Sequence, residues 1–104
     1  MIEIDNENLY NTSEIKRRLE PVFTANRVKS AILFGSYAKG EATEHSDIDI
    51  LVDSGLRGLD FVGLIENVRE VLGKNVDLID VHYVNADSPI EREIMKTGVR
   101  IYEQ

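Results

Sequence analysis

The stretch from Val28 to Asp53, VKSAILFGSYAKGEATEHSDIDILVD, constrains the fold more than any other part of the chain. Its apolar run Ala31–Phe34 predicts a central strand covered on both faces. Gly35-Ser36 interrupts this run, and Gly40 ends what can only be about one turn of helix. Ser46–Asp53 then predicts a second strand. The connection between the strands allows either an antiparallel pair or a crossover, and the sequence leaves both open.

The remaining segments alternate between helical and strand patterns. We expect a helix over 13–25 with a disturbance at Pro21, a helix over 60–72 ended by Gly73, a strand over 75–84, a helix from the Asp87-Ser88-Pro89 start to 97, and a short strand over 99–102. This order predicts an α/β or α+β fold. At 104 residues, we expect a single domain over 1–104.

Composition excludes several classes of function. Cysteine is absent, which removes disulfides and thiolate metal sites. The net charge is −7, with no run of Lys and Arg, so we expect no direct nucleic-acid binding. No apolar run is long enough to span a membrane. The opening MIEIDNENLY is acidic and lacks the basic-then-apolar order of a signal peptide, so we expect a cytoplasmic protein.

Asp47 and Asp49 are the first candidates for chemistry. They lie two residues apart on a strand, so both side chains point to one face, whereas Ile48 and Ile50 point to the other. Two carboxylates about 4 Å apart repel by roughly 4 kcal/mol at an effective dielectric constant of about 20. A cation would offset this repulsion, and ligands that are all oxygen suit Mg²⁺. Two such carboxylates more often lie on a solvated strand face, so the neighbouring residues determine whether the pair is interpreted as a metal site.

Gly35-Ser36 supplies those neighbours. It stands where a strand ends and a helical turn begins, where we expect unpaired backbone N–H groups that can hold a phosphate. A phosphate-binding turn beside an acid pair is what phosphoryl-transfer chemistry needs. The spacing Gly35-x-x-x-x-Gly40 also begins like a P-loop, but Glu41 and Ala42 replace the Lys and Ser/Thr that such a loop requires. The P-loop interpretation therefore fails, and we expect a Mg²⁺-dependent phosphoryl-transfer site of another kind.

Gly35-Ser36, ten further residues and Asp47-Ile48-Asp49 together resemble the signature of the nucleotidyltransferase superfamily related to DNA polymerase beta. The surrounding LFGSYAKGEATEHSDIDILV is similar to its smallest branch, the minimal nucleotidyltransferases (MNT). Nearly the whole chain follows that branch, down to the VDLI strand and the closing IEREIMKTGVRIYE. The resemblance implies a polymerase beta-like nucleotidyltransferase fold, with a mixed sheet of about four strands flanked by three or four helices.

The resemblance also implies roles for individual residues. Gly35 and Ser36 would bind the triphosphate of ATP, and Lys39 stands where the family more often has Arg. Asp47, Asp49 and Asp77 would be the catalytic carboxylates and would hold two Mg²⁺ ions. Asp77 matches the third carboxylate of the family, on the VDLI strand. Asp80 competes for that role, but it faces the opposite side of the same strand.

Members of this size often serve as the antitoxin beside a HEPN-domain toxin, and several transfer AMP from ATP to a tyrosine of that partner. The resemblance therefore implies a protein adenylyltransferase that forms a hetero-oligomer with a HEPN toxin. Two alternatives remain: an antitoxin that only masks its partner, and transfer to a small hydroxyl compound such as an aminoglycoside. His45 and His82 are interpreted as solvated or satisfied side chains, because neither has a partner at metal-ligand spacing. Tyr37, beside Ser36, could stack on a base or be modified, but simple packing is the preferred interpretation.

Overall fold

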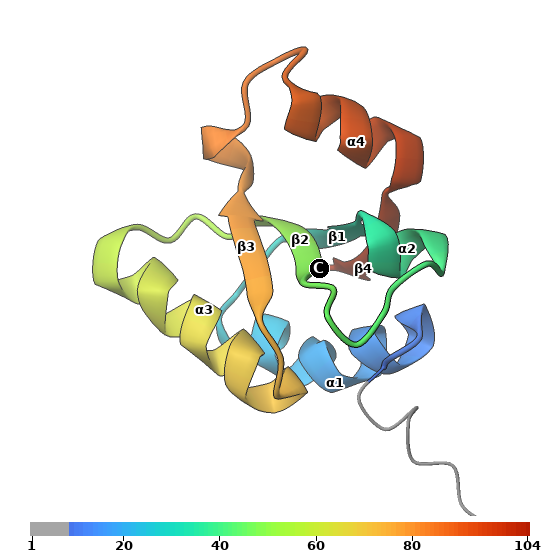
Figure 1. Ribbon diagram of the computed structural model, residues 1–104. Coiled ribbons are helices and arrows are strands. Elements are labelled where there is room, and N and C mark those ends of the chain that lie inside the picture. Colours follow the sequence, from blue (N-terminus) through green and yellow to red (C-terminus); the bar gives the residue numbers. More distant parts are fainter. Residues whose placement is uncertain (1–8) are drawn as a thin grey trace, which may run out of the picture.

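The computed structural model describes residues 9–104, so most of the acidic opening segment lies outside the described part. Within these residues the chain forms a mixed four-stranded sheet and four α-helices (Figure 1). In chain order the elements are α1 (Thr12–Ala25), β1 (Ser30–Phe34), α2 (Ser36–Lys39), β2 (Ile48–Asp53), α3 (Gly58–Leu72), β3 (Val76–Asp80), the 3₁₀ turn η2 (Val81–Tyr83), α4 (Pro89–Thr97) and β4 (Val99–Glu103). The predicted fold class is confirmed.

The strand order is β3-β2-β1-β4. Strand β1 runs antiparallel to both β2 and β4, and β2 runs parallel to β3. The connection through α2 therefore forms an antiparallel pair, which settles the alternative that the sequence left open. The crossover is made instead by α3, which links the parallel strands β2 and β3.

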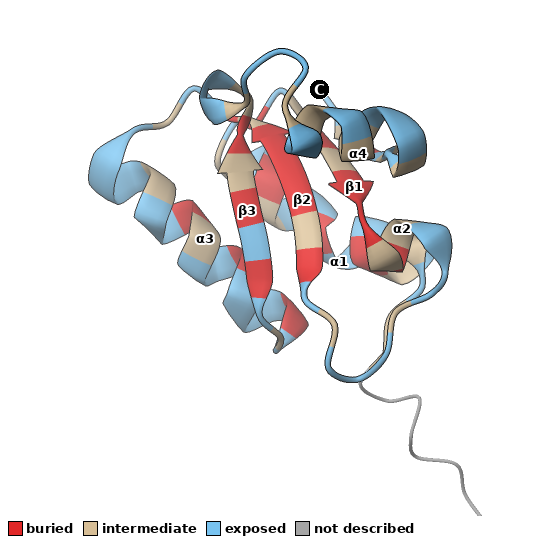
Figure 2. Cartoon of the chain, turned by 45° about the horizontal axis from the view of Figure 1, so that its top comes forward, coloured by how far each residue is buried: buried red, intermediate tan, exposed pale blue. Residues whose placement is uncertain are grey.

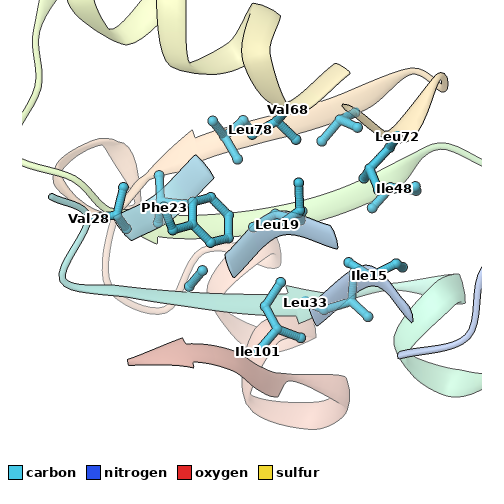
Figure 3. Packing of buried hydrophobic residues seen from close by; sticks show 14 of the residues in the cluster. Ile15, Leu19, Phe23, Val28, Leu33, Ile48, Val68, Leu72, Leu78 and Ile101 are labelled. Atoms are coloured by element: carbon cyan, nitrogen blue, oxygen red, sulfur yellow. The ribbon is translucent and has the colours of Figure 1, made fainter. Parts of the chain in front are cut away.

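Helices α1 and α3 cover one face of the sheet, and α4 lies over the other face near β1 (Figures 1 and 2). The core fills the space between α1, α3 and the sheet (Figure 3). It contains Ile15, Leu19 and Phe23 of α1, Leu64, Val68 and Leu72 of α3, and the inward side chains Leu33, Ile48, Ile50, Val52, Val76, Leu78 and Ile101 of the strands. The opposite face of β2 and β3 is thereby left for polar chemistry.

Helix α1 continues through Pro21 as one α-helix, although a disturbance was expected there. Proline removes the hydrogen bond to the carbonyl four residues earlier. Pro21 and Arg17 both lie on the exposed side of the helix, where water can hydrate that carbonyl. The side chain of Asn11 caps the helix by accepting a hydrogen bond from the backbone N–H of Glu14, at 2.8 Å.

Strand β3 ends earlier than the predicted range 75–84. It stops at Asp80, whose side chain accepts a hydrogen bond from the backbone N–H of His82 and starts the 3₁₀ turn η2. The predicted start of α4 is confirmed, with Ser88 as the cap and Pro89 in the first turn. No helix in the part of the chain that the structure describes has the length and apolar character needed to cross a membrane.

Candidate active site

Asp49 of β2 and Asp77 of β3 lie side by side on the face opposite the core. They are direct partners in the parallel register of the two strands, while their neighbours Ile48 and Ile50 are fully buried on the other face. The pKa of Asp49 is raised from 3.8 to about 6. Burial is the largest cause, followed by the negative charges of Asp77 and Asp47 and a hydrogen bond with Asp77. The site therefore concentrates negative charge that a cation would stabilise.

The Gly35-Ser36 turn packs directly onto this acid pair. Gly35 has φ 77° and ψ −152°, a conformation that essentially only glycine adopts. A Cβ atom at this position would collide with Oδ2 of Asp49. Glycine is thus required both by the backbone angle and by the carboxylate beneath it. The turn leads into α2, which brings Ser36 and Lys39 to the same end of the sheet.

Helix α4 adds two residues to the site that the sequence analysis missed. The hydroxyl of Thr97 accepts a hydrogen bond from the backbone N–H of Gly35 at 3.0 Å. Glu93 lies 3.8 Å from Nζ of Lys39, and its charge contributes to the raised pKa of Asp49. The expectation that the Gly35 N–H is unpaired was therefore wrong. The spacing of Glu93 and Thr97 along α4, one helical turn apart, placed them on a common face, but nothing local indicated what that face contacts.

Asp47 is placed differently from the other two acids, although its charge reaches Asp49. It precedes β2, is exposed, and lines a separate hollow with residues that include His45 and Lys74. Within residues 9–104, no three histidine, cysteine or acidic side chains are grouped so that they could hold a metal ion. Mg²⁺ typically takes only one or two carboxylates and completes its shell with phosphate oxygens and water. The pair Asp49 and Asp77 fits that requirement.

Asp80 is not part of the site. It is 2% exposed and lies on the core side of β3, as its position in the strand predicted. Ser54 donates a hydrogen bond from Oγ to Oδ2 of Asp80 at 2.6 Å, and Nδ1 of His82 lies 2.8 Å from Oδ1. Burial alone would raise the pKa of Asp80, but these hydrogen bonds outweigh it and lower the pKa. Asp80 thus ties the end of β2 to η2, and His82 is a satisfied partner of it.

The predicted structural roles of the other two side chains agree with their surroundings. Tyr37 of α2 is 4% exposed and packs in the core. His45 is exposed, and its ring lies 3.5 Å from the carboxylate of Glu44. Neither side chain belongs to the group around Asp49 and Asp77.

A hollow of about 570 Å³ opens next to the acid pair. Its walls come from the sheet and from helices α3 and α4. They combine acidic and apolar side chains with one arginine: Phe34, Asp49, Ile65, Arg69, Asp77, Leu78, Ile79, Pro89, Ile90 and Glu93.

Comparisons with known proteins point to one family. The model of the family described as Polymerase beta, Nucleotidyltransferase matches residues 17–104. The protein named "Putative protein adenylyltransferase MJ0435" from Methanocaldococcus jannaschii is 46% identical over 77 residues, which cover 72% of this chain and 83% of that protein.

Solved structures share the fold. A crystal structure described as a toxin-antitoxin with AMP-PNP matches with a TM-score of 0.73 and 22% identity, covering 86% of this chain and 73% of that chain. A chain in the structure of a tri-AMPylated Shewanella oneidensis HEPN toxin in complex with MNT antitoxin matches with a TM-score of 0.67 and 20% identity, covering 89% and 73%. At these identities the match shows a common fold.

Proposed function

Because this chain belongs to the polymerase beta nucleotidyltransferase family, we propose that it transfers AMP from ATP to a tyrosine hydroxyl of a HEPN toxin and so acts as its antitoxin. The M. jannaschii relative is named as a protein adenylyltransferase. One structural neighbour comes from a complex of a tri-AMPylated HEPN toxin with an MNT antitoxin, and another comes from a toxin-antitoxin structure with the ATP analogue AMP-PNP. The chemistry of this chain's own site is consistent with the same reaction, and the cytoplasm, where ATP is available, is the compartment we propose.

The pairing of Asp49 with Asp77 beneath the Gly35-Ser36 turn is the observation that carries the proposal. Structural strand faces rarely place two carboxylates in direct register, because like charges opposite each other destabilise a sheet. Here one of the two carries a pKa raised to about 6, and the turn that would hold the phosphates touches it. Acid pair and turn together form a site for a phosphate-bound cation.

Asp49 and Asp77 would hold magnesium. Asp47, whose negative charge also raises the pKa of Asp49, would be the third carboxylate that the family resemblance implies. The ion, when bound, supplies positive charge that stabilises the phosphates and the leaving pyrophosphate. Ser36 and Lys39 would bind the triphosphate. Asp77 would accept the proton of the attacking hydroxyl. The hydroxyl oxygen forms a bond to the α-phosphorus of ATP, the bond from that phosphorus to the β-phosphate bridge breaks, and pyrophosphate leaves.

Mass spectrometry of proteins that co-purify with the chain from its native host tests this function. Incubation with Mg²⁺ and ATP should add one or more AMP masses to a tyrosine of the partner, and incubation without Mg²⁺ should not. The same experiment with the Asp77→Asn variant should give no AMP addition. If Asp77→Asn loses both AMP transfer and toxin neutralisation, the antitoxin acts as an enzyme. If Asp77→Asn loses AMP transfer but still neutralises the toxin, masking by binding alone is favoured.

Thermal unfolding in EDTA distinguishes catalytic from structural carboxylates. The Asp47→Asn and Asp77→Asn variants should melt at the same temperature as the wild type or higher, because each change removes repulsion without removing a structural contact. A lower melting temperature for both would mean that these acids support the fold, and the metal assignment would then be wrong.

A further inference from the structure

Thr97, at the end of α4, is joined to the signature turn across 62 residues of sequence. Its hydroxyl accepts the N–H of Gly35 at 3.0 Å and donates to the backbone carbonyl of Glu93 at 2.9 Å. The hydroxyl therefore donates a hydrogen bond within α4 and accepts one from the turn. The resulting chain of two hydrogen bonds runs from Gly35 into the backbone of the helix.

The end of α4 is held close to β1 by a second feature. A Cβ atom at Gly98 would come within 2.5 Å of the carbonyl oxygen of Ile94 and 2.9 Å of Cγ2 of Ile32. Since the chain passes this point without a side chain, the last turn of α4 can approach β1, the strand that precedes Gly35. The position of Thr97 is thus fixed by backbone packing as well as by its own hydrogen bonds.

Gly35 needs such a partner. The residue is buried, and its backbone conformation is one that the chain adopts only when its surroundings determine it. A buried N–H without a partner would favour other conformations in which water or another acceptor reaches it. On one side the carboxylate of Asp49 limits the turn, and on the other side Thr97 binds its N–H. Together these contacts hold the turn in its observed conformation.

We propose that Thr97 is a positioning residue for nucleotide binding: its hydroxyl holds the Gly35-Ser36 turn in the conformation that accepts the triphosphate. This inference rests on the proposed nucleotidyltransferase function. Thr97 does not touch the reacting atoms, and it acts through Gly35. When a site is only partly populated in its competent conformation, the apparent dissociation constant rises by the inverse of that fraction. Loss of the hydroxyl therefore weakens nucleotide binding without changing the chemistry of the acids.

The Thr97→Val variant keeps the shape of the side chain and removes the acceptor. Its dissociation constant for AMP-PNP with Mg²⁺, measured by calorimetry well below the melting temperature, should rise about ten-fold. Thr97→Ser, which retains the hydroxyl, should stay within about two-fold of the wild type. In transfer assays the KM for ATP should rise in Thr97→Val while kcat stays nearly constant, because the lost contact serves bound substrate and transition state alike.

Ser88→Ala provides the matched control. It removes the cap at the other end of α4, where Oγ of Ser88 accepts the N–H of Glu91 at 3.2 Å, and it does not touch the turn. This variant should melt at a lower temperature and bind AMP-PNP like the wild type. If Thr97→Val does not fold, Thr97→Cys replaces it, since a thiol is a weak acceptor of similar size.

The outcomes separate the two proposals. Wild-type affinity in a folded Thr97→Val or Thr97→Cys variant overturns the positioning role and leaves the proposed function standing. Weakened binding in Ser88→Ala equal to that in Thr97→Val also overturns it, because general loosening of α4 would then explain both. Absence of AMP-PNP binding by the wild type overturns the nucleotidyltransferase function and this inference with it.

Discussion

Replacement of Asp49 by asparagine should stabilise the metal-free protein at pH 8. The pKa of Asp49 rises from 3.8 to about 6 on folding, because of burial first and then the charges of Asp77 and Asp47. A shift of about two units corresponds to about 3 kcal/mol of differential interaction. Asp49 is only half-buried, so solvent screening reduces this, and we expect a gain of about 1–2 kcal/mol in the free energy of unfolding.

The pH dependence of this gain has a definite sign. The folded state binds the proton of Asp49 more tightly than the unfolded state, so stability from this group is fully present below pH 3.8 and is lost as the pH rises through about 6. Asp49→Asn should remove that loss. The advantage of the variant should therefore be largest at pH 8 and should disappear near pH 4.

Urea denaturation in EDTA at several pH values between 4 and 8 measures the effect. Asp53→Asn, four residues further along the same strand, serves as the control and should change the free energy of unfolding by less than about 0.5 kcal/mol. The reasoning would be refuted if Asp49→Asn were less stable than the wild type at pH 8, or if both had the same pH profile.

Three further substitutions test individual contacts, each by urea denaturation. Asp80→Asn should lower the free energy of unfolding by about 2–3 kcal/mol at pH 7, because hydrogen bonds to a buried charge are lost. Since the pKa of Asp80 is lowered in the folded state, this loss of stability should shrink as the pH falls below about 4. An unchanged loss at pH 3 would contradict the assignment. Gly35→Ala should lower the free energy of unfolding by more than about 3 kcal/mol. Gly40→Ala, at a similar φ of 76° but with open space around it, should lower it by only about 1 kcal/mol. Equal losses would show that the contact of Gly35 with Asp49 is unimportant. Tyr37→Phe should leave the protein as stable or about 1 kcal/mol more stable, because the buried hydroxyl has no hydrogen-bond partner among the described residues, and a clear loss would reveal one.

Much of the fold was predictable because its signals are local. The 3.6-residue spacing in α3, the cap at Ser88 with Pro89, and the C-terminal Gly73 all act within one helical turn, and the structure confirms each of them. The opposite faces of Asp77 and Asp80 also followed from the two-residue period of a strand. Local geometry was sufficient for these features.

The relation between distant elements was not predictable in the same way. The antiparallel pairing of β1 with β2 depends on how the connection folds, and its length permitted two answers. The bond from Gly35 to Thr97 joins residues 62 apart, and the contact of Glu93 with Lys39 joins two helices, so neither has a signature in the local sequence. Helix continuity at Pro21 was missed because tolerance of proline depends on exposure, which only the packed structure reveals.

The position of β3 at the edge of the sheet affects which strand pairing opens first in local unfolding. Strand β3 is paired on one side only, through a parallel ladder, and Asp49 and Asp77 face each other across that ladder. Without a cation, we expect this repulsion to open the β2–β3 pairing before the antiparallel pairings of β1. Bound Mg²⁺ and nucleotide would then stabilise the pairing of β2 with β3. Amide hydrogen exchange along Val76–Asp80 should therefore slow on binding of AMP-PNP and Mg²⁺ far more than exchange along Ser30–Phe34. Binding of the substrate would thus stabilise the same strand pairing that forms its binding site.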